Sequence, residues 1–534
     1  MARLVLVTSG LEHLGIAALA AHARALGHDV RIVYEPKPFS SNSGPDNALL
    51  ARLLEPTPEE TAAKIAAHAP DVVGFSSYTI THGWSVEVAR HVKRQLRVPI
   101  VFGGPHVQGS PAHVLREPSI DAVVEGEGEG PLADLLACVE KGRFGRADVA
   151  NVWFRDPSGG PPIRNALRPL IEDLDVLPWA DKRGFYEAVP AFEREFYVIS
   201  RRGCPYRCSF CEYSVFPRQY PGQKPVRRRS VGDVIAELAA WKRRGVMRKV
   251  FFWDAIFTLD LKWIEEFADA YAREIALPFE CYSHPQVMTR EMARALARAG
   301  AAMVRVGVQT VNGDTLAEVD RRGGPERVEQ TIAHLRDAGI PYALDHILAL
   351  PGEGLDDQIA ALRFYNRVRP QRVYTHWMTY LPGTTALERA RDDGSLSEAQ
   401  VERILTGDQT DGFEAPRVLD PSRRGELDDM ARLSVVLDLL PVLPRRTVDW
   451  LIESRAYRFV PRLYNVRSVA QVVTGLAGDV ALRERTSTML LGMMQSARLV
   501  ASAPKSPSEW PGRPAPQTET ATRPRARLRV LSSG

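Results

Sequence analysis

The chain has 534 residues, enough for several domains that each bury a core without disulfide bonds. A net charge of +4 spread over this length concentrates no field for nucleic acid or a membrane surface, so we expect a small-molecule partner. The first residues lack the basic start and cleavage site of a signal peptide, and no apolar run could span a bilayer, so we expect a cytoplasmic location.

The first 145 residues alternate short β-branched runs with amphipathic stretches. The runs and the first helical stretch fall at residues 4–7, 15–26, 29–34, 72–75, 98–102 and 122–124. This alternation is typical of a parallel, doubly wound sheet. We therefore expect a Rossmann-like domain over residues 1–145.

Clusters of Gly, Ser or Pro mark the ends of four of these predicted strands. They are Ser9-Gly10, Ser76-Ser77 (followed by Tyr78-Thr79), Gly103-Gly104-Pro105 and Gly126-Glu127-Gly128-Glu129. Ligands of parallel sheets bind at the carboxyl ends of the strands, so the first domain is predicted to carry a ligand.

The rest of the chain divides into four parts. Residues 146–192 are rich in Pro, Arg and Asp and are predicted to link two domains. A second strand-helix series over 193–397 predicts a partial (β/α)6 barrel with its site at the C-terminal mouth. A mainly helical domain over 398–500 and a disordered tail over 501–534 complete the prediction. The six predicted barrel strands are 196–200, 249–253, 279–283, 303–308, 342–349 and 372–380.

Three cysteines follow directly on the first predicted barrel strand, within the segment 201–212 that we term the cysteine loop. Cys204, Cys208 and Cys211 are separated by three and two residues, and loops with such short spacings hold iron-sulfur clusters. A zinc site would need a fourth ligand nearby, and residues 212–225 contain neither His nor Cys. An iron-sulfur cluster is the favoured prediction over zinc or packing.

With Phe210 before the last cysteine, the cysteine loop resembles the signature of the radical S-adenosylmethionine (SAM) superfamily. The resemblance implies a 4Fe-4S cluster whose open iron binds SAM and whose electron cleaves it to a 5′-deoxyadenosyl radical. It also implies a low-potential electron donor such as flavodoxin or ferredoxin. Further stretches resemble the family's SAM-binding segments, at Asp254, Gln309, Pro351 and Gly352. Without the cysteines, each of these glycine turns would be interpreted as an ordinary loop at the end of a strand.

The small-residue clusters of the first domain resemble the cobalamin-binding domain found ahead of many radical SAM domains. Glycines there remove Cβ atoms that would block the nucleotide tail of the cofactor. Because no Asp-x-His-x-x-Gly motif lies near residues 10–15, the resemblance implies cobalamin without a His ligand. A domain that kept this fold without a ligand is the alternative. His82 and His106 are weaker candidates as cobalt ligands, since packing explains lone histidines as well.

Several other residues have both a functional interpretation and a structural one. Cys138 and Cys281 are expected to pack as small hydrophobic residues, with a catalytic thiol at Cys281 left open. Arg227-Arg228-Arg229 could be a phosphate patch, a solvated face or a brace for the cysteine loop. Residues near the ends of late barrel strands are substrate-side candidates, chiefly Tyr282, His284 and Tyr380, with Tyr374, His376 and Trp377 beside them.

The combined resemblance implies a cobalamin-dependent radical SAM methyltransferase that acts on an unactivated carbon of a small molecule, through the 5′-deoxyadenosyl radical and methylcobalamin. One rival is a cobalamin radical SAM enzyme that catalyses cyclisation, ring contraction or rearrangement. A second is a non-catalytic cobalamin or SAM sensor, against which the intact cysteines argue. A tRNA methylthiotransferase would need further cluster cysteines in the first domain, where only Cys138 occurs.

Overall fold

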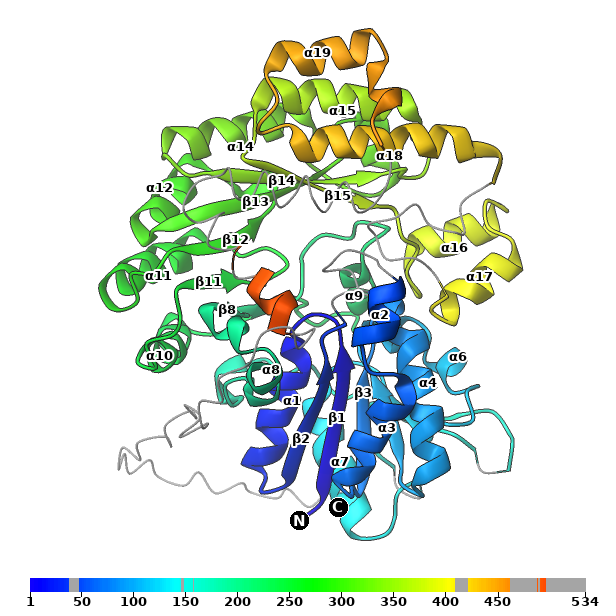
Figure 1. The fold of residues 1–534 in the computed structure, drawn as a ribbon. Coiled ribbons are helices and arrows are strands. Elements are labelled where there is room, and N and C mark those ends of the chain that lie inside the picture. The colour runs from blue at the N-terminus through cyan, green and yellow to red at the C-terminus, as the bar shows by residue number, and fades with distance from the viewer. Residues whose placement is uncertain are drawn as a thin grey trace, which may run out of the picture.

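The computed structural model describes residues 1–37, 48–145, 148–156, 158–408, 421–461, 487 and 490–495. Its described part consists of two β-sheets with helices packed around them. Figure 1 shows the first sheet with its N-terminal strand β1 pointing toward the second sheet. The predicted C-terminal tail, residues 501–534, lies outside the described residues, as does most of the predicted helical stretch 488–500.

The first sheet has seven strands in the order β2-β1-β3-β4-β5-β6-β7. Five of them are parallel and match the predicted positions: β1 (Arg3–Ser9), β2 (Asp29–Glu35), β3 (Val72–Ser76), β4 (Ile100–Gly103) and β5 (Ala122–Val124). These strands read as continuous apolar runs because both faces are covered. Leu4 and Leu6 pack on one face and Val5 and Val7 on the other.

Helices cover both faces of this sheet. On the face of Leu4 and Leu6 lie α1 (Leu14–Ala25) and α7 (Glu129–Glu140), and on the opposite face α3 (Pro58–Ala67) and α4 (Thr79–Gln95). Three short helices complete the domain: α2 (Ala48–Leu54), α5 (Pro105–Gly109) and α6 (Pro111–Val114).

The segment 146–192, expected as a linker, contains strands that belong to the first sheet. The hairpin β6 (Val152–Phe154) and β7 (Ile163–Arg164) pairs antiparallel with β5 and lengthens the sheet by two strands. Sequence pattern missed this hairpin because its strands are only three and two residues long and are defined by their pairing. The elements η1 (Leu174–Val176), α8 (Arg183–Ala188) and η2 (Pro190–Arg194) then lead to the second sheet.

The second sheet is entirely parallel, in the order β15-β14-β13-β12-β11-β8, which confirms the predicted fold class. Its strands are β8 (Glu195–Val198), β11 (Lys249–Phe252), β12 (Phe279–Ser283), β13 (Ala301–Gln309), β14 (Tyr342–Leu348) and β15 (Arg372–Trp377). The helices that connect them are α10 (Val231–Lys242), α11 (Leu261–Glu274), α12 (Arg290–Ala299), α13 (Gly313–Glu318), α14 (Pro325–Asp337) and α15 (Leu355–Val368). Each presents one apolar stripe to the sheet; in α11 it comprises Trp263, Ile264, Phe267, Ala268 and Tyr271.

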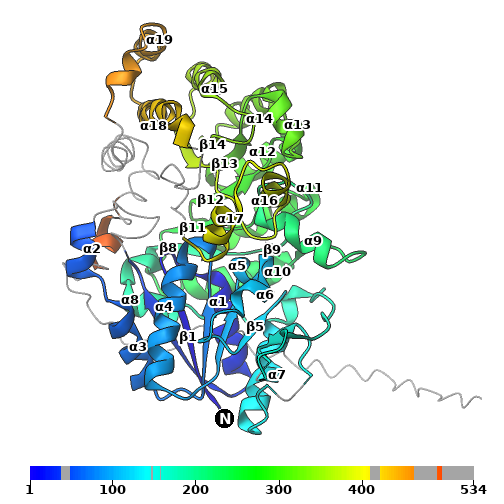
Figure 2. The same cartoon turned by 90° about the vertical axis from the view of Figure 1, so that its right-hand side faces the viewer.

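The cysteine loop lies between two short strands of its own. β9 (Arg201–Arg202) pairs antiparallel with β10 (Arg227–Arg228), and between them come η3 (Glu212–Ser214) and α9 (Val215–Gln219). After the barrel, α16 (Thr385–Asp392) and α17 (Glu398–Leu405) precede α18 (Arg424–Leu439), α19 (Arg445–Glu453) and η6 (Ala456–Phe459). Figures 1 and 2 both show α18 and α19 beside α15, on the side of the barrel away from the first domain. Within the described ranges, no helix is both long and apolar enough to cross a membrane.

Candidate functional site

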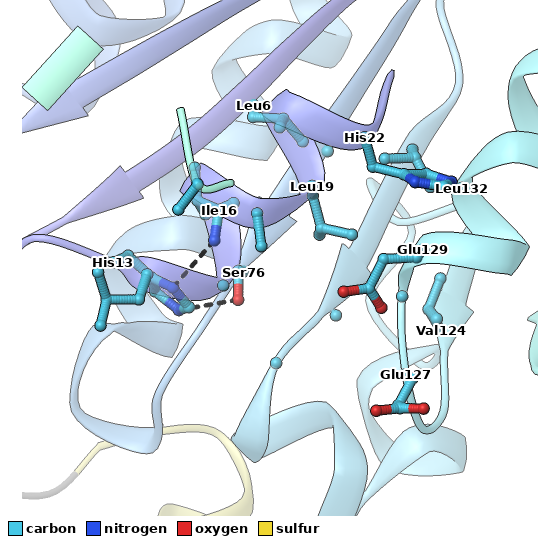
Figure 3. A pocket seen from close by; sticks show the side chains of 18 of the residues that line it. Leu6, His13, Ile16, Leu19, His22, Ser76, Val124, Glu127, Glu129 and Leu132 are labelled. Atoms are coloured by element: carbon cyan, nitrogen blue, oxygen red, sulfur yellow. Dashed lines mark hydrogen bonds between the residues drawn. The ribbon is translucent and has the colours of Figure 1, made fainter. Parts of the chain in front are cut away.

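A cavity of about 450 Å³ lies at the carboxyl edge of the first sheet, where the first domain faces the barrel. One wall comes from β1, α1 and the ends of β3, β4 and β5 (Figure 3). The opposite wall comes from β8 and from Glu212, Tyr213, Val215 and Phe216, which directly follow the cysteine loop's last cysteine. The cavity therefore borders both the predicted cobalamin-binding strand ends and the residues that follow the cysteine loop's last cysteine.

Most of the residues predicted to bind cobalamin line this cavity. They are Ser76, Tyr78, Gly103, Gly104, Gly126, Glu127 and Gly128. Ser77 and Thr79 are absent from its lining and instead hydrogen-bond to buried histidines, at 3.2 Å to His82 Nδ1 and 3.1 Å to His106 Nδ1. Assignment of these residues to cobalamin stays a prediction.

Two glycines of the cavity wall have backbone conformations that favour glycine. Gly104 has φ +98°, and a Cβ there would lie 2.7 Å from Ser76 Oγ and 2.9 Å from the Ser77 nitrogen. Gly126 has φ +92°, and its Cβ would overlap the Tyr220 hydroxyl. The absent side chains allow these two positions to pack closely against Ser76, Ser77 and Tyr220 at the cavity wall, where a Cβ would clash.

His82 and His106 lie away from the cavity lining. Their rings stack on each other at 3.9 Å, and His106 Nε2 lies 2.9 Å from the Leu405 carbonyl oxygen. Burial lowers the pKa of His82 to about 4, with a smaller contribution from His113. Both rings therefore pack as neutral groups between the first domain and α17.

A third histidine, His13, lines the cavity and was missed from the sequence. Its Nδ1 accepts a hydrogen bond from the Ile16 N–H at 3.2 Å and so caps α1, while Nε2 lies 3.0 Å from Ser76 Oγ (Figure 3). Because Nδ1 accepts, the proton of the neutral ring sits on Nε2, and burial lowers the pKa of His13 to about 4. Its position directly after a strand and before a helix was the signal that could have found it.

Glu127 carries its charge toward other side chains rather than into open space. Its carboxylate accepts hydrogen bonds from Arg202 and Arg227, both at 2.8 Å, and from the Ile171 N–H at 2.8 Å. Arg227 also pairs through its backbone with Arg202 at the start of the cysteine loop, and a role of the arginine triplet in bracing this loop stays a prediction. Arg228 pairs with Asp260, and Arg229 pairs with Asp233 and Glu237.

The three cysteines of the loop are free and lie near one another. Burial raises the pKa of Cys204 and of Cys211, and the neighbouring thiols raise both further. Cys208 Sγ accepts a hydrogen bond from Arg321 Nη1 at 3.4 Å. Partly buried thiols that lie close together are costly to ionise. The nearby Arg321 and a positively charged iron centre would both lower the cost of forming the thiolates.

Across the described residues, no group of three His, Cys, Asp or Glu side chains converges closely enough to hold a metal ion. A cluster takes each thiolate at a different iron, so its ligands stand farther apart than those of a single ion. The donor set, three thiols from one loop, therefore fits a cluster better than zinc.

The loop that carries the cysteines is held at both sides by backbone hydrogen bonds. Ser209 N–H donates to the Val319 carbonyl at 2.9 Å, and Ala386 N–H donates to the Ser209 carbonyl at 3.0 Å. Phe210 packs into the same apolar cluster as Leu350 and Tyr380. These contacts fix the loop against the end of α13, the first turn of α16 and the residues that follow β14 and β15.

Asp254, predicted to lie near SAM, holds the start of the cysteine loop. Its Oδ1 accepts from the backbone N–H groups of Ser200 at 2.9 Å and Arg201 at 2.6 Å, and its Oδ2 accepts from Ser200 Oγ at 3.1 Å. Burial raises the pKa of Asp254 to about 6 despite Arg201. In this structure its contacts are those of a positioning residue.

The other residues predicted to bind SAM lie at the ends of barrel strands. Gln309 ends β13 with φ +72°, an unusual conformation for a residue other than glycine. Pro351 and Gly352 follow β14 in a turn, where Gly352 has φ +78°. These placements agree with strand-end loops, and the contacts with SAM stay a prediction.

The three substrate-side candidates lie in different surroundings. The Tyr282 ring lies 5.4 Å from Phe251 and 4.7 Å from the Arg305 guanidinium. His284 stacks on Tyr206 of the cysteine loop at 4.0 Å, and its buried Nε2 has no hydrogen-bond partner among the described residues. Tyr380 is buried in the cluster around Phe210, and Cys281 packs in the core between sheet and helices.

Comparisons with known proteins match the two domains separately. A model of the B12 binding domain matches residues 3–136, and a model of the radical SAM superfamily matches residues 198–365. The chain is 26% identical to an uncharacterized methyltransferase of Pyrococcus horikoshii, over 71% of this chain and 78% of that protein. It is 24% identical to the cytidylyl-2-hydroxyethylphosphonate methyltransferase of Streptomyces wedmorensis, over 65% and 72%.

A further relative has a different printed activity. The anaerobic magnesium-protoporphyrin IX monomethyl ester cyclase of Rubrivivax gelatinosus is 25% identical over 61% of this chain, and the match covers 59% of the cyclase, less than two thirds of its length. Among solved structures, the radical SAM methyltransferase TsrM from Kitasatospora setae matches with TM-score 0.63 at 15% identity, over 93% of this chain and all of that one. The cobalamin-dependent radical SAM enzyme OxsB matches with TM-score 0.62 at 14% identity, over 93% and 80%. At these identities the structures show a shared fold.

Proposed function

Because this chain is a B12-binding radical SAM enzyme, which uses a [4Fe-4S] cluster, SAM and cobalamin, we propose that it transfers a methyl group to an unactivated carbon of a small molecule. When bound, the cluster and SAM supply a radical that abstracts hydrogen, and cobalamin supplies the methyl group. The residues of the chain bind, orient and shield these groups. The family assignment sets aside the alternative of a non-catalytic sensor.

The observation that carries the proposal is the shared cavity. Its first-domain wall is formed by strand ends that end in glycine, and its opposite wall begins one residue after Cys211. A methyl carrier bound in the first domain would thus lie on one side of this cavity, with the residues that follow Cys211 on the other. Mostly aliphatic side chains line the wall beneath it, including Leu6, Leu19 and Leu132, and exclude water from the site (Figure 3).

The protein's own contribution to the radical site is positional. The three cysteines would hold the cluster, while Arg321 donates to Cys208 and Asp254 fixes the backbone on which the loop begins. On this proposal a low-potential protein such as flavodoxin or ferredoxin delivers the electron to the cluster.

The relatives favour methyl transfer without deciding it. Two of the three relatives above are named methyltransferases, and the third is a cyclase. The cyclase gives a specific reason to retain a second candidate, in which the same cofactors drive cyclisation or rearrangement and no methyl group leaves SAM.

Product analysis separates these two functions. Anaerobic, reduced holoprotein is incubated with methyl-labelled SAM and a small-molecule extract of the host cells. A methyltransferase should release S-adenosylhomocysteine and 5′-deoxyadenosine in comparable amounts and place the label in one extract component. If a product forms with 5′-deoxyadenosine but without label, methyl transfer is wrong and the rearrangement candidate replaces it.

A further inference from the structure

Four charged side chains meet at the boundary between the first domain and the barrel, and we term them the clamp: Glu127, Glu129, Arg202 and Arg227. Arg202 Nη1 donates to Glu127 Oε1 at 2.8 Å and to Glu129 Oε2 at 3.3 Å, while its Nη2 pairs with Glu129 Oε1. Arg227 Nη1 donates to the same Glu127 oxygen at 2.8 Å. Two guanidinium groups therefore face two carboxylates.

The clamp joins residues 127–129, which follow β5, to the base of the cysteine loop. Glu127 lies in the segment between β5 and α7, whose glycines line the cavity, and Glu129 is the first residue of α7. Figure 3 shows both carboxylates beside the cavity. Arg202 ends β9, two residues before Cys204, and Arg227 lies opposite it in β10. The contacts run from the base of the cysteine loop to the mouth of the first domain.

Three of the four side chains of the clamp are at most 9% exposed, while 27% of the Arg202 side chain is exposed, so the charges depend on each other. Glu129 is 4% exposed and Arg227 is 7% exposed. Burial alone would raise the pKa of Glu129, but the Arg202 guanidinium outweighs it and the pKa is lowered. Loss of one partner would leave a charge without compensation in a site shielded from water.

We propose that Arg202 is a positioning residue that sets the cysteine loop against the cobalamin-binding loop, and that Glu127 and Glu129 act as its anchors rather than as contacts to the cofactor. Arg227 and the Ile171 backbone complete the anchor, since the Ile171 N–H donates to Glu127 and its carbonyl accepts from Arg227 at 2.9 Å. The inference rests on the two cofactor sites and does not require that the reaction be methyl transfer.

The test compares Arg202→Gln, Glu129→Gln and the double variant with the wild type. Arg202→Lys retains the charge, and Arg228→Gln is the matched control because Arg228 lies in the same hairpin with a solvent-exposed partner, Asp260. If Arg202→Gln fails to fold, Glu129→Gln still weakens the ion pair with Arg202 and so tests the proposal. Neither readout needs a substrate.

The first readout is hydrogen exchange of the apo protein. Peptides covering residues 126–132 and 168–173 should exchange about tenfold faster in Arg202→Gln and Glu129→Gln, because local opening follows the loss of their anchor. The double variant should be no faster than Arg202→Gln alone, since both changes remove one interaction. Arg202→Lys should restore part of the protection and Arg228→Gln should match the wild type.

The second readout is the magnetic interaction between the reduced cluster and cob(II)alamin in substrate-free holoprotein. It should weaken or broaden in Arg202→Gln and stay unchanged in Arg228→Gln. Unchanged exchange and unchanged spin interaction in both single variants would overturn the proposal. Faster exchange across β1 and β3 as well would also overturn it, because that would mean the clamp stabilises the whole domain rather than positions two loops.

Discussion

At the scale of single residues, the direction of each side chain at the end of β3 decides its role. Successive residues of an extended chain point to opposite sides. Ser76 and Tyr78 accordingly line the cavity, whereas Ser77 and Thr79 pair with His82 and His106. The sequence could predict that this cluster lies at a ligand site, but not which of its members face the ligand, since that depends on where the strand meets the neighbouring loops.

Gly104 offers a prediction at this scale. Gly104→Ala should abolish cobalamin binding by the isolated apo protein, because the new Cβ would lie within 3 Å of Ser76 and Ser77. Gly27→Ala is the matched control, since Gly27 has a similar φ of +88° but open space around it. Cobalamin binding measured by absorbance should survive in the control. Equal cobalamin binding in the two variants would show that the close approach of Gly104 to Ser76 and Ser77 is not needed for binding.

His13 offers a second prediction, on the coordination of cobalt. Both ring nitrogens are engaged, by Ile16 and Ser76, and the Nε2 that faces the cavity carries the proton. The electron paramagnetic resonance spectrum of the cob(II)alamin form should therefore show no splitting from a His13 nitrogen. His13→Gln should leave the spectrum unchanged. A nitrogen splitting that disappears in this variant would show that His13 is a ligand.

At the scale of elements, the long strands were predictable and the short ones were not. Buried apolar runs placed β1 to β5 and the six barrel strands within a few residues, because a parallel sheet covered on both faces imposes that pattern. The strands β6, β7, β9 and β10 have two or three residues each and take their form from their partners. Likewise, Asp254 was predicted from its motif to lie near SAM, but its contacts hold the backbone before the cysteine loop.

The cysteine loop carries the third prediction. Anaerobically reconstituted protein should bind about four irons, because one loop supplies all the predicted ligands. Replacement of Cys204, Cys208 and Cys211 by alanine should remove the iron and the cluster absorbance. Cys281→Ala is the control, since Cys281 is buried in the core and its loss should cost stability alone. Iron retained by the triple variant would refute the cluster assignment.

At the scale of the whole molecule, buried ion pairs fasten the first domain to the barrel on either side of the cavity. The clamp lies on one side. On the other, Lys182 Nζ lies 2.8 Å from Glu12 Oε1, with both side chains 1% exposed, and also donates to the Tyr197 carbonyl of β8. No sequence pattern predicted either ion pair. Arg202 and Glu129 are 73 positions apart and Lys182 and Glu12 are 170 apart, so only the folded chain brings these residues together.

The Lys182–Glu12 pair gives the fourth prediction. Lys182→Met should lower the free energy of unfolding by about 3–5 kcal/mol, since it leaves a buried carboxylate unpaired. Burial raises the pKa of Glu12, so without Lys182 folding favours the protonated carboxyl. The deficit should therefore be fully present at pH values above the raised folded-state pKa of Glu12 and should shrink as the pH falls toward the unfolded-state pKa of Glu.

Urea unfolding at about pH 5 and about pH 8 checks this sign. The double variant Lys182→Met/Glu12→Leu should recover most of the loss at the higher pH, because it removes the stranded charge. A deficit that is equal at both pH values would contradict the assignment of a charged Glu12 in the folded protein.

The hairpin β6–β7 has a consequence for how the first domain could exist alone. It covers β5, whose Ala122 and Val123 are fully buried, and brings Asn151, which donates to the Glu125 carbonyl at 2.7 Å. A fragment cut at residue 145 would leave β5 as an open edge that offers its unpaired N–H and C=O groups to a second copy. Such a fragment should self-associate, whereas one that retains the hairpin should sediment as a monomer.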